Sequence, residues 1–265
     1  MIRRVCSIGF LLMGSGCLAM AESQTLILIP SADTTLIEAV PNNNLGGQVF
    51  FNAGTTQNGP RVRGLMTFNL AGEIPVSAVI TSADLVMEVT GQPVDGFAAS
   101  NFELRRVLRP WGEGSQTAGP DMSPGLGQLA TFGEATWNHR FAGTTETWSV
   151  PGGAIGVDFS PVISADHYIY GTADSPYHFA STPELVADVQ FWLDHPDQNF
   201  GWMLRTQSEA TRFTARRFGS RESDLAPLLY LNYEAVPEPG TSVLIGLSSV
   251  AFVWLRFKSA SRPRR

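Results

Sequence analysis

The sequence holds only two cysteines, Cys6 and Cys17, and both lie within its first seventeen residues. The rest of the chain therefore has no disulfide framework and no thiol chemistry. A domain without cross-links must be stabilised by its core. Residues 22–235, about 215 in number, are enough for one sizeable core.

Lysine is almost absent as well, since Lys258 is the only one among 18 basic residues. Residues 22–235 carry eleven arginines and 23 acidic side chains, which gives this part of the chain a formal charge near −12. Such a surface disfavours nucleic acid and has no general attraction to anionic lipid. We therefore expect no nucleic-acid partner.

The chain also lacks the motifs of common catalytic sites: it has no GxSxG elbow, no HExxH pair and no glycine-rich phosphate loop. Glu113 and Glu134 could form a glycosidase-like carboxylate pair, but nothing in the sequence fixes their separation. Glu113 is better interpreted as part of a WGEG turn. We therefore expect a non-catalytic protein.

Residues 1–21 have the pattern of a secretory signal peptide. Two arginines precede an apolar run over residues 5–18, and Ala19-Met20-Ala21 supplies the small-x-small pattern of a signal peptidase site. Cys17 allows a lipoprotein alternative, although Gly14 stands where a branched apolar residue is wanted. We predict cleavage after Ala21, which removes both cysteines.

Residues 236–265 form a second targeting pattern. Pro237-Glu238-Pro239 leads into an uncharged run over residues 242–255, about fourteen residues against the ~20 that a helical span needs. A basic cluster follows: Arg256, Lys258, Arg262, Arg264 and Arg265. A hinge, an apolar run and a basic cluster in this order suit a membrane segment whose basic end stays inside.

This tail resembles the PEP-CTERM sorting signals of Gram-negative bacteria, which an exosortase-type membrane protease recognises and cuts near the Pro-Glu-Pro element. The resemblance implies export through the inner membrane, transient membrane contact through the tail, and a cell-surface, matrix or secreted location after cleavage. The alternative is an ordinary C-terminal membrane anchor.

The central part of the chain has the pattern of short strands and turns. Residues 61–70 alternate with period two, which is typical of a half-buried strand. The one convincing helix covers residues 183–195, with Thr182 as its cap and Pro196 as its stop. Residues 115–127 show no period and are expected to form a long surface loop. We predict an all-β, antiparallel sandwich of jelly-roll type with one short helix, flanked by the signal peptide and a short C-terminal hydrophobic helix.

Five segments between residues 32 and 233 resemble the DNRLRE-type domain, a β-sandwich module of bacterial secreted proteins: RGLMTFNLAGEIPVSAVITSADLVMEV, VLRPWGEG, ATWNHR, VADVQFWLDHPDQNFGWMLR and FGSRESDLAPLLYLNY. Related members include carbohydrate-binding modules that attach to polysaccharides such as alginate. The resemblance thus implies one sandwich domain over residues 22–235 and an extracellular polysaccharide as its partner, for example an exopolysaccharide of a biofilm matrix.

Four arginines within ten residues are the first candidate binding group: Arg212, Arg216, Arg217 and Arg221. On an acidic domain they could create a local positive field, and their guanidinium forks match uronate carboxylates in bidentate fashion. Strand alternation predicts that Arg212 and Arg216 point outward and that Arg217 lies at a bulge. The alternative is pairing with nearby carboxylates, such as Arg221 with Glu222.

Tryptophans are the second candidate group, because sugar rings stack on exposed indoles. Trp111, Trp137 and Trp148 lie at strand ends or in glycine-rich stretches, where we expect a ligand to reach them. Alternatively, the first two plug the end of the sandwich. Trp192 and Trp202 recur with apolar positions and are expected in the core.

A calcium ion is the one cofactor that the sequence suggests. Asp33 together with Asn42, Asn43 and Asn44 offers the oxygen ligands that a hard cation prefers. The alternative is that these asparagines simply serve the PNNNLGG turn.

We therefore expect an exported, non-catalytic protein that binds extracellular polysaccharide. A structural matrix or envelope protein with a protein partner is the main alternative. A polysaccharide lyase or hydrolase is the less favoured one.

Overall fold

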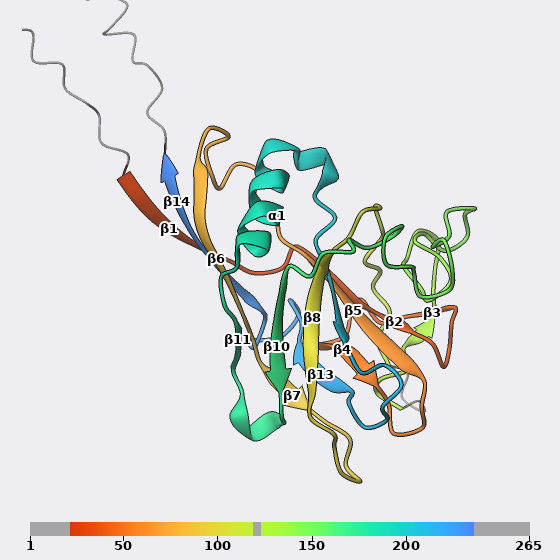
Figure 1. The fold of residues 1–265 in the computed structure, drawn as a ribbon. Coiled ribbons are helices and arrows are strands. Elements are labelled where there is room, and N and C mark those ends of the chain that lie inside the picture. The colour runs from red at the N-terminus through yellow and green to blue at the C-terminus, as the bar shows by residue number, and fades with distance from the viewer. Residues whose placement is uncertain (1–21, 119–122, 236–265) are drawn as a thin grey trace, which may run out of the picture. The chain divides into compact units, whose positions relative to one another are not determined.

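The computed structural model describes residues 22–118 and 123–235 (Figure 1). The predicted signal peptide and the predicted sorting signal, residues 1–21 and 236–265, lie outside the described residues. No helix in the part of the chain that the structure describes is long and apolar enough to cross a membrane. Both targeting signals therefore stay predictions.

Two antiparallel sheets build the domain that spans Ser23–Ala235. The smaller sheet has the order β1 (Glu22–Leu28), β14 (Leu228–Ala235), β6 (Val79–Met87) and β11 (Tyr177–Phe179). The larger, curled sheet has the order β10 (Ala165–Ile169), β8 (Ser100–Arg106), β12 (Trp202–Thr206), β5 (Arg61–Thr67), β4 (Phe50–Thr55), β13 (Arg216–Gly219) and β7 (Val89–Gly91). On its other side, β5 pairs with β2 (Ala32–Ile37), and β3 (Asn43–Asn44) with β9 (Gln128–Leu129) forms a separate short pair.

The helix α1 (Pro183–Asp194) is the only α-helix within residues 22–118 and 123–235, and it packs on β6. Thr182 caps it by accepting the Leu185 N–H on its hydroxyl at 2.9 Å. Two short 3₁₀ turns, η1 (Thr172–Asp174) and η2 (Pro196–Gln198), complete the helical residues. With 38% strand and 9% helix, the structure confirms the predicted all-β sandwich.

The main core fills the space between the two sheets. Trp202 of β12 meets Trp192 of α1 with ring centroids 4.4 Å apart, and both rings are buried, as predicted. Phe218 of β13 stacks against Phe51 of β4 at 5.5 Å. Burying each such ring stabilises the fold by about 2–3 kcal/mol, so packing alone can hold a domain without cross-links.

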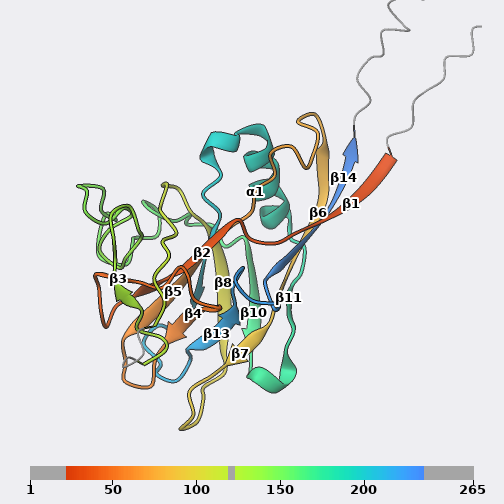
Figure 2. The same ribbon diagram turned by 180° about the vertical axis from the view of Figure 1, so that it is seen from behind.

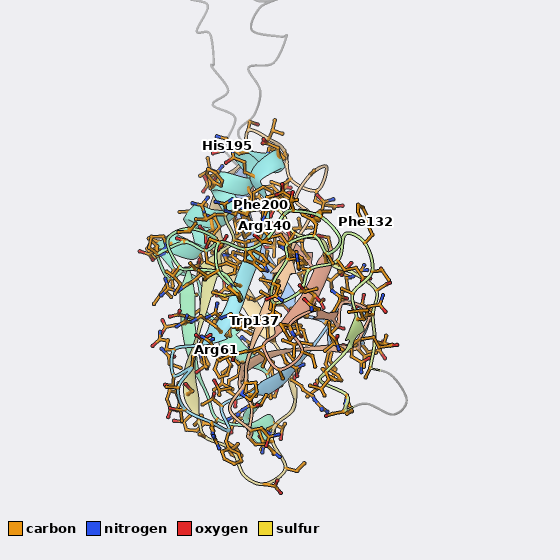
Figure 3. All side chains as sticks on the ribbon, turned by 90° about the vertical axis from the view of Figure 1, so that its right-hand side faces the viewer. Arg61, Phe132, Trp137, Arg140, His195 and Phe200 are labelled. Carbon is orange, nitrogen blue, oxygen red and sulfur yellow. The ribbon has the colours of Figure 1, made fainter. Side chains whose placement is uncertain are left out.

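A second hydrophobic cluster lies on the outer face of the larger sheet, under the irregular segment 107–164. Leu36, Leu65 and Met203 of the sheet pack there against side chains of the segment: Val107, Ala135, Trp137, Trp148 and Phe159. Figure 3 looks toward this side of the molecule, where Arg61 lies close to Trp137; its guanidinium is 5.2 Å from the ring centroid. The stretch 115–127 is loop where described, as predicted, but the following residues form a layer over the sheet.

Buried arginines hold this irregular layer in place. The Arg63 guanidinium donates to the carbonyls of Gly152 and Gly153 at 2.6 and 2.9 Å. The Arg105 guanidinium donates to those of Ser160 and Pro161 at 3.1 and 2.7 Å. These carbonyls have no sheet partner, so the arginines satisfy acceptors that would otherwise be buried without a hydrogen bond.

Candidate functional site

One of the depressions in the described surface is a groove of about 450 Å³, which we name the β4–β13 groove. Its walls are the β4–β5 turn (residues 56–60), the start of the β7–β8 loop (residues 92–94) and residues 123–126. Its floor is formed by β4 and β13. Figures 1 and 2 show α1 at the upper end of the domain and the β7–β8 loop at the lower end, so the groove lies at the end opposite to α1.

Strand pairing places two polar side chains next to each other on this floor. In the antiparallel register of β13 and β4, Arg217 lies directly opposite Asn52. Their strand neighbours Phe218 and Phe51 are buried in the main core, so alternation turns Arg217 and Asn52 to the other face. On its far side Arg217 lies opposite Gly91 of β7, where an added Cβ would come within 3.0 Å of the arginine Cδ. The glycine therefore leaves room for the long side chain.

The Arg217 guanidinium is half-buried and lies over the Phe50 ring, 4.5 Å from its centroid. Burial lowers the pKa of this guanidinium, although an arginine keeps its charge. Eight of the eleven arginines in the described residues form ion pairs with carboxylates. The three that form none with described residues are Arg212, Arg216 and Arg217.

Asn52 is the second unusual residue of the groove. Its side chain is 8% exposed, and its Nδ2 has no hydrogen-bond partner within the described residues. A buried donor without a partner costs about 1–3 kcal/mol, so natural proteins rarely keep one without a reason. An added Cβ at Gly125 would lie 3.8 Å from this Nδ2, so the amide nitrogen faces the wall formed by residues 123–126.

The rest of the described lining contains no Asp or Glu, in a domain that carries 23 acidic residues. The amides Gln57, Asn58 and Gln92 add hydrogen-bonding groups, and Pro60, Pro93 and Val94 add apolar surface. The groove therefore combines two arginines, of which Arg216 is engaged by backbone carbonyls, with several amides and apolar walls. Such a lining can hold a polar ligand that carries a negative charge.

The structure separates the four predicted arginines. Arg217 lies at a register shift between β13 and β7, as predicted. The outward orientation predicted for Arg216 is wrong: the side chain is 1% exposed and donates only to backbone carbonyls, among them Ala98 and Ala215, each at 3.0 Å. Alternation failed because β13 begins at Arg216 itself, after Phe213, which has a φ of 67°. No regular strand pattern therefore precedes Arg216.

The other two arginines differ from each other. Arg221 forms ion pairs with Glu113 at 2.5 Å and Glu222 at 2.9 Å, so the pairing alternative is confirmed for this residue. Arg212 is exposed, as predicted, and lines a separate shallow depression beside Glu38 and Glu209. Neither side chain belongs to the β4–β13 groove.

The three predicted sugar-stacking tryptophans face the protein. Trp137 and Trp148 are 3% and 2% exposed, so the expectation that a ligand reaches them is wrong. Trp111 is half-buried, packs against the same cluster and donates its indole N–H to the Phe200 carbonyl at 2.9 Å. Their apolar rings are needed to fasten segment 107–164 to the outer face of the sheet.

The predicted calcium ligands use their oxygens within the protein. Asn44 Oδ1 accepts the backbone N–H groups of Gly46 and Gln116, and Asn42 Oδ1 accepts from the Asn138 amide. Asp33 is 1% exposed, and burial raises the pKa of its carboxyl to about 8. These oxygens are thus engaged within the protein, and calcium at Asp33, Asn42 and Asn44 stays a prediction.

Glu113 and Glu134 act as acceptors within turns. Glu113 Oε1 accepts the Asp33 N–H at 2.8 Å in addition to Arg221, and Glu134 accepts the N–H groups of Ser115 and Thr131 at 2.9 and 2.7 Å. Glu113 thus links segment 107–164 to β2, and Glu134 links residues within this segment. Neither lines the β4–β13 groove.

Asn52 and Phe50 are the site residues that sequence reasoning missed. One signal was present: in the stretch Phe50-Phe51-Asn52-Ala53, alternation places Phe50 and Asn52 on the same face. No local pattern in the sequence indicates that this strand pairs with β13, which carries Arg217.

Comparison with known proteins found no family model that matches the chain and no curated protein that matches it. The fold and the geometry of the groove therefore carry the functional argument.

Proposed function

We propose that this chain is an exported, non-catalytic protein that binds extracellular polysaccharide in the β4–β13 groove. The observation that carries the proposal is the cation of Arg217, half-buried in a groove whose described lining has no carboxylate, on a domain of net charge near −12. Within residues 22–118 and 123–235, every arginine outside the predicted group pairs with an acidic side chain. The acidic domain thus leaves one recessed place open to an anionic partner.

The composition of the groove suits a sugar chain. Sugar rings present apolar C–H faces and polar hydroxyl edges, and the groove offers apolar Pro60, Pro93 and Val94 beside amide groups. A groove of about 450 Å³ holds a few sugar units at most. We therefore assign it as a contact for one short stretch of a longer polymer.

Binding without catalysis is favoured by the chemistry of the same lining. Its described residues offer no carboxyl, imidazole or thiol group close to a ligand in the groove. Hydrolysis or elimination of a polysaccharide needs a positioned acid and base. The lining supports recognition better than either reaction.

The targeting signals give the proposed location. The signal peptide and the PEP-CTERM-like tail support export through the inner membrane of a Gram-negative bacterium and processing by an exosortase-type protease. β14 ends at the α1 end of the domain, away from the groove (Figure 1). We propose that the protein acts at the cell surface or in the extracellular matrix, as an exported DNRLRE-like sandwich.

Affinity electrophoresis of the full exported chain tests the proposal. Gels that contain the producing cell's own exopolysaccharide, or uronate-rich polymers, should retard the protein relative to an acidic control protein of similar size. Unchanged migration in every polymer would contradict the proposal and favour a matrix protein with a protein partner. Release of soluble sugar products would instead revive the enzyme alternative.

A further inference from the structure

The β4–β13 groove contains a matched pair of donors, and the pair points to a specific ligand group. Building on the proposed function, we propose that Arg217 and Asn52 form a carboxylate subsite for an acidic sugar unit within the polysaccharide. The Arg217 guanidinium takes the sugar carboxylate, and Asn52 Nδ2 donates to a second oxygen of the same unit.

The register of the two strands places the donors within reach of one sugar unit. Arg217 and Asn52 are direct cross-strand partners on one face of the sheet, and such pairs have Cβ atoms about 5 Å apart. A single pyranose ring with its carboxylate spans a comparable distance. The two donors are therefore close enough to serve one unit, with Nδ2 enclosed beside Gly125, so that a ligand oxygen reaches it when the wall formed by residues 123–126 shifts.

The environment of Arg217 favours a carboxylate over other anions. The Phe50 ring covers one face of the guanidinium and leaves its N–H edge available for a ligand. That edge is a planar fork that matches the two oxygens of a carboxylate. Arg216, the other arginine of the lining, is saturated by backbone carbonyls. One available cation suits a monoanion, and a doubly charged phosphate would remain half-neutralised.

Asn52 imposes the second requirement, because its Nδ2 donor needs an oxygen acceptor of the ligand at a fixed place. Its backbone N–H is satisfied by the Thr35 hydroxyl at 2.9 Å, which fixes the strand, whereas its Nδ2 has no described partner. A ligand oxygen at this position removes the cost of the buried donor. Discrimination of this kind is strong, because a ligand without that oxygen leaves the donor unpaired.

Titration calorimetry on the full exported chain tests the subsite with a matched pair of ligands, an oligogalacturonate and the same oligomer with methyl-esterified carboxyl groups. The acid form should bind about 10- to 100-fold more tightly than the ester, as expected for a charge-assisted hydrogen bond. A sulfated galactan, whose sulfate esters are also monoanions, is the second anionic probe and should bind more weakly than the acid form, because its charge is spread over three tetrahedral oxygens instead of the planar pair that matches the guanidinium fork. Equal affinity for the acid and ester forms, or tighter binding of the sulfated polymer, would overturn the inference.

Two variants and one control assign the effect to residues. Arg217→Gln should weaken binding of the acid form about 10- to 100-fold and leave the weak binding of the ester unchanged. Asn52→Leu should also weaken binding while the melting temperature stays equal or rises, since the unpaired donor is gone. Arg212→Gln, an exposed arginine outside the groove, is the control and should bind like the wild type. If Asn52→Leu lowers the melting temperature and keeps its affinity, Asn52 has a structural role and the inference is wrong.

The binding experiments distinguish a wrong subsite from a wrong function. If neutral polymers bind as well as acidic ones and Arg217→Gln has no effect, the subsite is wrong and the protein is still a polysaccharide-binding protein. If the chain is retarded by no polymer, both are wrong.

Discussion

Unpaired polar groups mark the groove at the scale of single residues. Asn52 is the only side-chain amide of residues 22–118 and 123–235 whose buried nitrogen lacks a partner. Arg217 lies beside it without an acidic partner in the same residues. Leaving a buried donor unsatisfied lowers the free energy of unfolding, and such costs are typical of binding sites. Asn52 and Arg217 are therefore the residues on which the functional argument depends.

Arg216 has a purely structural role, which gives a stability prediction. Its guanidinium holds the carbonyls of the β7–β8 loop and of Tyr170 near β10, and burial lowers its pKa because no carboxylate compensates. Arg216→Met leaves those buried acceptors unpaired and should lower the free energy of unfolding by about 2–4 kcal/mol. Urea denaturation measures this, with exposed Arg212→Met as the control, for which we expect a change within about 0.5 kcal/mol. Equal effects for both variants would contradict the assigned role.

Asp33 gives a pH prediction. Burial raises the pKa of its carboxyl to about 8 in the folded protein, against about 3.9 in an unfolded chain. The folded state thus binds the proton of Asp33 more tightly than the unfolded state does. The protonated carboxyl therefore contributes fully to the free energy of unfolding below pH ~4, and this contribution is lost as the pH rises toward 8. The Asp33→Asn variant cannot ionise at this position, so the melting temperature of the variant relative to that of the wild type should increase between pH 5 and pH 8. A difference that is independent of pH over this range would show that Asp33 ionises normally.

At the scale of single elements, the N-cap residue Thr182 explains where α1 begins. Thr182 accepts the Leu185 N–H, and its hydroxyl also donates to the Ser164 carbonyl next to β10. Thr182→Ala removes the cap and this link, and should lower the free energy of unfolding by about 1–2 kcal/mol. Thr182→Ser keeps both bonds and is the matched control, with an expected change below about 0.5 kcal/mol. Similar losses for the two variants in thermal or urea unfolding would refute a capping role.

Sequence reasoning succeeded for elements whose signals are local. The alternation at residues 61–70 predicted the strand β5, although the strand ends at Thr67 and is buried on both faces rather than one, and the capped apolar pattern predicted α1 within one residue of its end. It failed where the deciding contact is remote. Trp137 is buried because a segment without any period folds over the outer face of the sheet, which no periodicity reports. The groove was missed for the same reason, because the pairing of Asn52 with Arg217 joins two strands far apart in the chain.

At the scale of the whole molecule, the two predicted targeting signals imply a definite mature chain. A cleaved signal peptide gives a protein that begins at Glu22, and a processed PEP-CTERM-like tail gives one that ends near Pro239. Intact-mass spectrometry of the protein recovered from the medium and the envelope measures both ends at once. Retention of Arg265 would instead indicate a C-terminal membrane anchor.

Charge distribution connects the groove to function at this same scale. Residues 22–235 carry 23 acidic side chains, but the described lining of the β4–β13 groove contains none, and Arg217 lies there without an acidic partner among the described residues. Such a field attracts an anionic polymer to one end of an otherwise repulsive surface. Added salt screens the attraction between Arg217 and the polymer as well as the repulsion by the acidic domain, so the salt dependence of binding measures which of the two is larger.

The most direct test of the account is affinity electrophoresis of the full exported chain as wild type, Arg217→Gln and Arg212→Gln in a gel that contains an acidic polysaccharide. We predict that the wild type and Arg212→Gln are retarded equally, and that Arg217→Gln loses about 90% or more of the affinity, as the loss of a charge-assisted hydrogen bond implies. Equal retardation of all three proteins, or of none, would contradict polysaccharide binding in the β4–β13 groove.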